Sequence, residues 1–195
     1  MLFNHVAFHD RSRFQIQKTQ RVFTLVRSPF TTVCENLSIL GFQFYEGSAY
    51  AGSAAVFGKP FDPVTRNRPM YALYQIFLNN KYQFLSLGSL LIYIINTEVR
   101  VNGGEYLYLI DPVCSALGFY LRLGFMPDPD EVREKDDLTG LSAFSASPIP
   151  FFRNHYLNEH LWLSRIYSRW RCCTETLNMT LIESVGKKFK YLQPV

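Results

Sequence analysis

The first half of the chain alternates apolar and polar residues in several short stretches, which predicts strands. The stretch "RVFTLVR", residues 21–27, alternates and contains β-branched residues, so it predicts the first strand. Residues 42–45 and 48–57 have a similar pattern on either side of Glu46-Gly47. This arrangement predicts a β-hairpin.

A short helix is predicted between the first strand and the hairpin. Thr31 or Thr32 could cap its first turn, because a threonine hydroxyl accepts a hydrogen bond from free backbone N–H groups. The helix would continue through Leu40 and end at Gly41, since glycine commonly follows the last turn of a helix.

The middle of the chain changes from a continuous apolar run to helical spacing. "MYALYQIFL", Met70–Leu78, is nearly all apolar and predicts a strand that is covered on both faces. Apolar residues then recur every three or four positions, which predicts a helix from Phe84 or Leu85 to about Arg100. Asn102-Gly103-Gly104 would close it.

The pattern predicts one more strand and helix, followed by less regular segments. Residues 105–110 form the strand and residues 113–123 the helix, which ends at Gly124. The acidic stretch 127–139 is expected to be a surface loop, and a returning strand is expected over residues 141–146.

The last 45 residues differ in character from the rest. Tyr156, Leu163, Tyr167 and Trp170 share one helical face, so residues 155–171 are predicted as an amphipathic helix. Residues 177–193 fit either a helix or a strand. The expected organisation is one domain over residues 1–150 and a helical extension over 151–195, packed on the domain or at an oligomer interface.

Composition and charge narrow the class of protein. Of the 195 residues, 48% are hydrophobic and 16% aromatic, which indicates a packed globular chain. The net charge of +4 is scattered, so charge alone does not indicate a nucleic-acid partner. The longest apolar run, residues 84–95, is shorter than the roughly 20 residues that span a bilayer, and no membrane span is predicted.

The four cysteines and four histidines of the sequence do not indicate a disulfide scaffold or a metal site. The cysteines form neither a Cys-x-x-Cys pair nor a disulfide scaffold, so reduced thiols and a cytoplasmic location are expected. The N-terminus lacks the apolar centre of a secretory signal. His5 and His9 are spaced as on one helical face, but no cysteine or carboxylate cluster accompanies them, and no metal site is predicted.

Candidate chemistry lies where the apolar strand 70–78 leads into a helix. A helix N-terminus presents unpaired backbone N–H groups and a partial positive charge, which suit a pyrophosphate. The loop must be rich in small residues so that phosphates can approach the backbone. Ser86, Gly88 and Ser89 meet part of this requirement, and Gln83 precedes them.

Two motifs in the sequence resemble the GNAT N-acetyltransferase superfamily. The pyrophosphate loop of that superfamily has the pattern Gln/Arg-x-x-Gly-x-Gly/Ala, and Gln83, Ser86 and Gly88 occupy its three positions. Its later helix carries Asn or Ser, Ala and Phe-Tyr-x-x-x-Gly-Phe, matched in the same order by Ser115, Ala116, Phe119-Tyr120 and Gly124-Phe125. The separation of the motifs also suits the superfamily.

The resemblance implies an α/β (α+β) fold with a mixed, mostly antiparallel sheet flanked by helices, and it implies acetyl-CoA as the acyl donor. The donor would lie between strands 70–78 and 105–110, with its thioester sulfur near Tyr120 as general acid. The residues implied in binding it are Phe77, Leu78, Asn79, Gln83, Phe84, Leu85, Ser86, Leu87, Gly88, Ser89 and Ser115.

Two departures from the superfamily pattern leave alternatives open. The loop is apolar at Phe84, Leu85 and Leu87, where charged or small residues are common, so Lys81, Arg100 or another base would have to supply positive charge. The strand 70–78 holds no carboxylate to act as general base, and Glu46 and Tyr74 are the candidate substitutes.

The resemblance therefore predicts an acetyl-CoA-dependent N-acetyltransferase. The alternative is a catalytically weakened GNAT-like fold that acts as a binding or regulatory module. The amine acceptor would be a small molecule or a protein, while a charged tRNA and a homodimer stay open. The loop 59–69, with Arg66 and Arg68, would flank the acceptor site.

Overall fold

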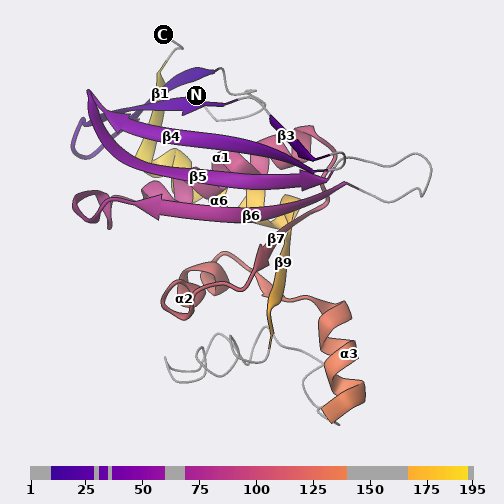
Figure 1. Ribbon diagram of the computed structural model, residues 1–195. Helices are drawn as coiled ribbons and strands as arrows, with labels where there is room; N and C mark the ends of the chain where they lie inside the picture. Colours follow the sequence, from indigo (N-terminus) through magenta and orange to yellow (C-terminus); the bar gives the residue numbers. More distant parts are fainter. Residues whose placement is uncertain (1–9, 29–30, 35–36, 60–68, 140–166, 193–195) are drawn as a thin grey trace.

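The computed structural model describes residues 10–28, 31–34, 37–59, 69–139 and 167–192. Ten strands in these ranges form one sheet in the order β10-β1-β2-β4-β5-β6-β7-β9-β8, with β3 beside β4 (Figure 1). Among the described strands, only β6 and β7 pair in parallel. The strands are β1 (Arg11–Ile16), β2 (Val22–Arg27), β3 (Thr31–Cys34), β4 (Leu37–Glu46), β5 (Ala49–Lys59), β6 (Met70–Leu78), β7 (Tyr106–Ile110), β8 (Met126–Pro127), β9 (Arg169–Cys173) and β10 (Phe189–Leu192).

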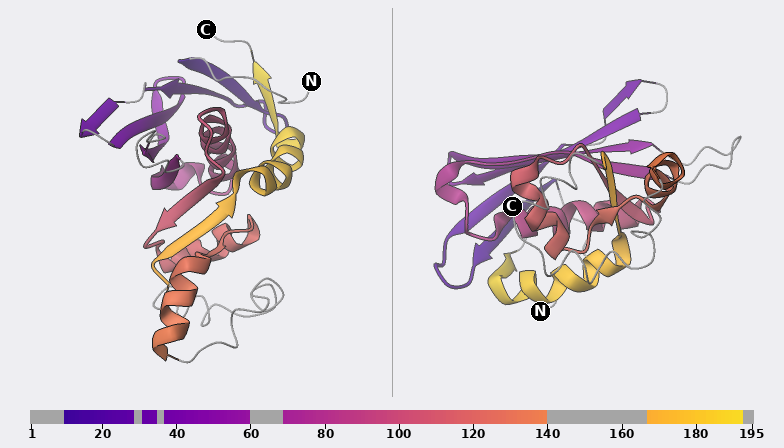
Figure 2. Two further views of the ribbon diagram at one scale, coloured as in Figure 1. Left: turned by 90° about the vertical axis from the view of Figure 1, so that its right-hand side faces the viewer. Right: turned by 90° about the horizontal axis from the view of Figure 1, so that it is seen from below.

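The two longest described helices cover one face of this sheet, which we call the inner face. Figures 1 and 2 show α1 and α6 together on the same side of β4, β5 and β6. The helices are α1 (Leu87–Val101), α2 (Cys114–Arg122), α3 (Pro129–Thr139) and α6 (Thr174–Lys188), with a 3-10 turn, η1 (Asn80–Tyr82), before α1. No described helix has the length and apolar character needed to cross a bilayer. The sheet is mixed, mostly antiparallel and flanked by helices, so the predicted fold class is confirmed.

The core lies between the inner face and these helices. Alternate residues of β4 point inward, and Leu40, Phe42 and Phe44 are fully or almost fully buried. From the other side α1 contributes the buried side chains of Leu91 and Ile94, among others. The apolar side chains of the strands and those of the helices therefore pack against each other in one buried layer.

The opposite, outer face has no described helix over it. Gln43 and Tyr45 of β4 point to this face, and both keep part of their surface exposed. The predicted burial of β6 on both faces is wrong for the same reason. Its side chains Met70, Tyr74 and Phe77 are 48%, 61% and 46% exposed.

The predicted hairpin is confirmed as β4 and β5, but the predicted helix before it is wrong. Thr31 is the first residue of β3, which pairs with β4 through Thr31 and Ile39. Threonine and valine are β-branched and favour the pleated backbone, and an adjacent strand was available to them. Gly41 therefore lies inside β4 instead of ending a helix. Strand β1 was not predicted.

The elements from residue 70 to 125 agree with the prediction closely. Strand β6 has the predicted bounds, β7 begins one residue later than predicted, and α2 is one residue shorter than predicted at each end. Helix α1 begins at Leu87, two or three residues later than predicted, because the preceding residues form the strained loop described below.

The acidic stretch predicted as a loop is a helix, α3, over most of its length. Pro129 stands at its first position, where a missing backbone N–H costs nothing. Asp130 and Glu131 lie in the first turn and interact favourably with the positive end of the helix dipole. These favourable residues at the helix N-terminus therefore allow a helix to form in a stretch whose polarity predicted a loop. The predicted strand 141–146 lies outside the described residues.

The C-terminal segment contributes both strands and a helix. Residues 155–166 of the predicted amphipathic helix lie outside the described part, and from Arg169 onward that prediction is wrong, because the chain forms β9. The order Arg-Trp-Arg-Cys also alternates with period two, and Trp170 and Cys172 are buried on one face. The ambiguous segment 177–193 contains most of α6 and then β10.

These C-terminal elements join the sheet at two separate places. Strand β9 pairs with β7 and β8, while β10 pairs with β1 through partners such as Ile16 and Phe189. Helix α6 is tied to α1 where Asn96 donates a hydrogen bond to the carbonyl of Thr174 (2.8 Å). The division of the chain near residue 150 stays a prediction.

Candidate active site: an open strand edge that leads into a strained loop

Strands β6 and β7 pair over only a short length and then part. The parallel ladder joins residues 71–73 to residues 107–109. Beyond it β6 continues to Leu78, while β7 ends at Ile110. The part of β6 from Tyr74 to Leu78 therefore has β5 on one side and no described strand on the other. A β-bulge at Tyr74, opposite residues 55 and 56 of β5, marks the place where the edge opens.

The direction of the peptide groups shows which ones face the open edge. The carbonyl of Phe77 approaches Gly52 of β5 so closely that a Cβ there would lie 2.4 Å from the oxygen. The amide of Asn79 donates to the carbonyl of Ala51 (3.0 Å). Because successive residues of a strand point their peptide groups to opposite sides, those of Ile76 and Leu78 face the opening.

The open edge leads into a loop with an unusual backbone. Phe84 and Ser86 have φ angles of 66° and 61°, a region that favours glycine. Ser86 is followed directly by the right-handed residues of α1, and such a left-handed to right-handed step aligns successive N–H groups around a concavity that suits an anion. The loop thus combines an anion-binding backbone geometry with the N-terminus of a 15-residue helix.

The side chains of the loop leave this backbone accessible. Phe84 is 99% exposed and points away from the protein, while Leu87 is fully buried. Leu85, Ser86, Gly88 and Ser89 are half-buried, and Gln83 is exposed and donates to Asn80 (3.0 Å). A Cβ on Gly88 would lie 3.6 Å from Phe119 and 3.9 Å from Leu78, so this position joins the loop to both walls of the opening.

A cation that the sequence did not reveal lies at the loop. The ammonium group of Lys188, in the last turn of α6, donates to the hydroxyl of Ser86 (2.9 Å). The two residues are 102 positions apart, so only the three-dimensional fold brings them together. Lys81 instead lies 4.7 Å above the ring of Tyr82, and Arg100 is at the far end of α1.

Tyr120 lies on α2 and is 8% exposed. Its ring packs between Phe119 and Phe125, with ring centroids 5.3 Å and 5.6 Å away. Burial raises the pKa of the phenol above its usual value of 10, so the hydroxyl keeps its proton at neutral pH. A raised pKa also makes it a weaker acid than a free tyrosine.

The two candidate general bases, Glu46 and Tyr74, lie in different surroundings, and neither is well suited to accept a proton. Glu46 accepts two hydrogen bonds from Arg21, at 2.6 Å and 2.8 Å, and this hydrogen bonding lowers the pKa of the carboxyl group. A lower pKa makes Glu46 a weaker base. Tyr74 is exposed on the outer face, where its ring packs against Phe57 with centroids 4.5 Å apart. Their assignment as bases stays a prediction.

One further candidate for cofactor binding, Ser115, lies on α2, and the cysteines and possible metal ligands complete the description of the site. Ser115 is exposed in the first turn of α2. Cys114, Cys172 and Cys173 are free thiols, and burial raises the pKa of Cys172 to about 12. Within the described ranges no three His, Cys, Asp or Glu side chains gather as metal ligands would. Of the loop 59–69, predicted to flank the acceptor, residues 60–68 lie outside those ranges.

Comparisons with protein-family models and with curated proteins found no match. Solved structures do match. An acetyltransferase of the GNAT family from Desulfovibrio desulfuricans is 26% identical over 48% of this chain and 57% of its own, with a TM-score of 0.38. The AtaT toxin, bound to acetyl-CoA and to the C-terminus of the antitoxin AtaR, is 13% identical over 72% of this chain and 70% of its own, with a TM-score of 0.44.

A third match is an Escherichia coli N-acetyltransferase that acts on the alanine of a ribosomal protein. It is 23% identical over 46% of this chain and 54% of its own, with a TM-score of 0.36. The chain thus spans little more than half the length of two of these three proteins. One of these matches is described as a member of the GNAT family, and the two sequence motifs resemble the superfamily of the same name.

Proposed function

We propose that this protein binds acetyl-CoA along the open edge of β6 and transfers its acetyl group to an amine. One observation carries the proposal: the open edge leads directly into a loop whose backbone suits an anion. An extended polar chain can pair with a free strand edge, and a pyrophosphate can bind the helix N-terminus that follows. Acetyl-CoA has both parts in this order.

The residues of the open edge and of the loop would divide the binding of acetyl-CoA between them. The peptide groups of Ile76 and Leu78 would pair with the pantetheine arm, because they face the opening. The free N–H groups of Leu87, Gly88 and Ser89 would hold the pyrophosphate. Lys188 adds the positive charge that the apolar loop lacks, and it can reorient from Ser86 to a phosphate because both groups lie at the surface.

The chemistry would be direct attack of the amine nitrogen on the thioester carbonyl carbon. The C–N bond forms as the C–S bond breaks, the leaving thiolate takes the proton of the Tyr120 hydroxyl, and the phenolate that remains regains a proton from water. Burial raises the pKa of Tyr120, so its hydroxyl is protonated at neutral pH and can donate to a thiolate that develops beside it. The amine loses its own proton to water, since Glu46 is held by Arg21. A backbone N–H of β6 would polarise the carbonyl.

Calorimetric titration with acetyl-CoA, combined with an assay of CoA release against a panel of amines, tests the proposal. We expect binding in the micromolar range and release of free CoA with at least one class of acceptor. Binding without any release would favour the alternative of a binding or regulatory module. No heat of binding at high micromolar acetyl-CoA would exclude both the donor and the enzyme.

A further inference from the structure

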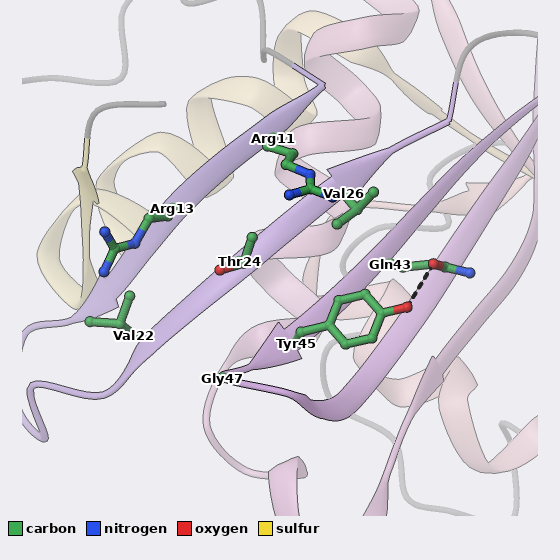
Figure 3. Close-up of a pocket in the computed structure, with 8 residues that line it drawn as sticks. All are labelled: Arg11, Arg13, Val22, Thr24, Val26, Gln43, Tyr45 and Gly47. Atoms are coloured by element: carbon green, nitrogen blue, oxygen red, sulfur yellow. Dashed lines mark hydrogen bonds between the residues drawn. The ribbon is translucent and has the colours of Figure 1, made fainter. Parts of the chain in front are cut away.

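The outer face of the sheet carries a cavity that lies apart from the open edge. Its volume is about 680 Å³, within the usual range for a ligand site, and it lies over β1, β2 and β4 (Figure 3). Two arginines, Arg11 and Arg13, project over it from β1. The lining residues are Arg11, Arg13, Val22, Thr24, Val26, Gln43, Tyr45 and Gly47, and none of them is acidic.

Both arginines are free to bind an anion. They are exposed, and neither forms an ion pair with another residue of the described ranges. As residues i and i+2 of one strand they point to the same face, about 7 Å apart along the strand. Their guanidinium groups thus present a repeated positive charge to any ligand in the cavity.

A continuous row of side chains leads from this cavity across the sheet. Arg13 pairs with Thr24 on β2, Thr24 with Tyr45 on β4, and Tyr45 with Tyr50 on β5. The rings of Tyr45 and Tyr50 are 5.8 Å apart, and Tyr50 stacks on Phe77 of β6 at 6.3 Å with an interplanar angle of 14°. Tyr50 and Phe77 are 39% and 46% exposed.

The row combines the two features that bind single-stranded nucleic acid. Arginines at one end can hold phosphates, and exposed aromatic rings along the rest can stack bases. From β1 to β6 the row crosses four strand spacings, or about 19 Å, which is longer than a small amine. We propose that the outer face binds a single-stranded nucleic acid, with phosphates at Arg11 and Arg13 and bases on Tyr50 and Phe77.

This binding surface does not depend on the proposed acetyl transfer. Phe77 belongs to the unpaired part of β6, so the aromatic row ends beside the proposed acetyl-CoA site. A nucleic acid could therefore be the acceptor, and that extension alone rests on the proposed function. The test measures nucleic-acid binding without acetyl-CoA, so either proposal can fail while the other holds.

Fluorescence anisotropy of a labelled oligouridylate of about 12 nucleotides tests the surface, because such strands match the site sizes of sheet-based binders. We expect a micromolar dissociation constant at low salt that weakens as salt is added. The double variant Arg11→Gln/Arg13→Gln should weaken binding at least tenfold and reduce the salt slope by about 1.4, or about 0.7 for each lost phosphate contact. Tyr50→Ala should weaken binding about fivefold or more, while Tyr50→Phe retains it.

The matched control removes two positive charges elsewhere. Arg100 and Arg122 are exposed on α1 and α2, so Arg100→Gln/Arg122→Gln changes the net charge equally and should leave binding almost unchanged. Three results would overturn the proposal: no oligouridylate binding at low salt, an equal loss in the control variant, or tighter binding of polyglutamate that Tyr50→Ala does not affect. The last result would indicate an acidic peptide instead. Circular dichroism confirms that each variant is folded.

Discussion

The two faces of the sheet use the same strands for different purposes. The inner face packs aliphatic and aromatic side chains under α1 and α6, and its residues are excluded from water. The outer face carries arginines, hydroxyls and exposed rings, and no described helix covers it. Both result from the period of two along each strand, which places alternate residues on opposite faces. The inner face therefore stabilises the fold, whereas the outer face is accessible to a ligand.

The largest difference between the faces should appear in how much a substitution on each face lowers the free energy of unfolding. Leu91 of α1 is fully buried, so Leu91→Ala should lower the free energy of unfolding by about 2–5 kcal/mol through lost burial and a residual cavity. Val26 points to the outer face and is half-buried, and Val26→Ala should cost about 1 kcal/mol or less. Urea unfolding measures both. Equal losses would contradict the assignment of the faces.

The next largest effect concerns the proposed chemistry at Tyr120. Tyr120→Phe removes the proposed acid but keeps the ring between its aromatic neighbours, so turnover should fall about 100-fold or more while acetyl-CoA affinity changes little. Tyr71→Phe is the matched control. It removes another buried hydroxyl, which donates to the carbonyl of Asn102 (3.0 Å), and should affect stability more than turnover. Unchanged turnover in Tyr120→Phe would remove this residue from the mechanism.

A smaller effect is expected where α6 meets the loop. Lys188→Gln should weaken CoA binding about tenfold, because it removes a charge-assisted contact to phosphate. Pantetheine, which lacks the phosphates, should bind both proteins equally. Lys187, one residue earlier, is paired with Glu183, so Lys187→Gln is a control with the same change of charge. An equal loss in both variants would mean that general charge, not position, matters.

The smallest effect concerns the ion pair beside η1. Hydrogen bonding to Arg21 lowers the pKa of Glu46, so the pair stabilises the folded protein above the unfolded pKa of about 4.3 and this stability is lost as pH falls through the lower folded value. Glu46→Gln should cost about 1 kcal/mol or less at pH 7, since the pair is partly exposed. At pH values below the folded pKa of Glu46, the variant and the natural chain should converge. Turnover should persist in the variant if water is the base.

The sequence predicted the middle of the fold because local pattern decides structure there. The apolar spacing of strand β6 and of helix α2 was enough to predict both elements, and the two motifs indicated a binding site between them. Tertiary contacts decided the rest. Thr31 forms a strand because β4 lies beside it, and Arg169 does so because Asp128, buried and 2.6 Å away, offsets its charge. Lys188 could not be placed at Ser86 from spacing, since the contact spans more than half the chain.

The pairing of β10 with β1 has a consequence for how the protein forms. These two strands lie near opposite ends of the described chain, so their ladder closes a very long loop, and contacts of this kind form late in folding. Lys188 immediately precedes β10, and its position at the loop depends on this closure. During synthesis the loop, α1 and Tyr120 would all be made before Lys188, the charge that we propose for phosphate binding. The affinity for CoA would then increase only when the last strand docks, which couples cofactor binding to the completion of the fold.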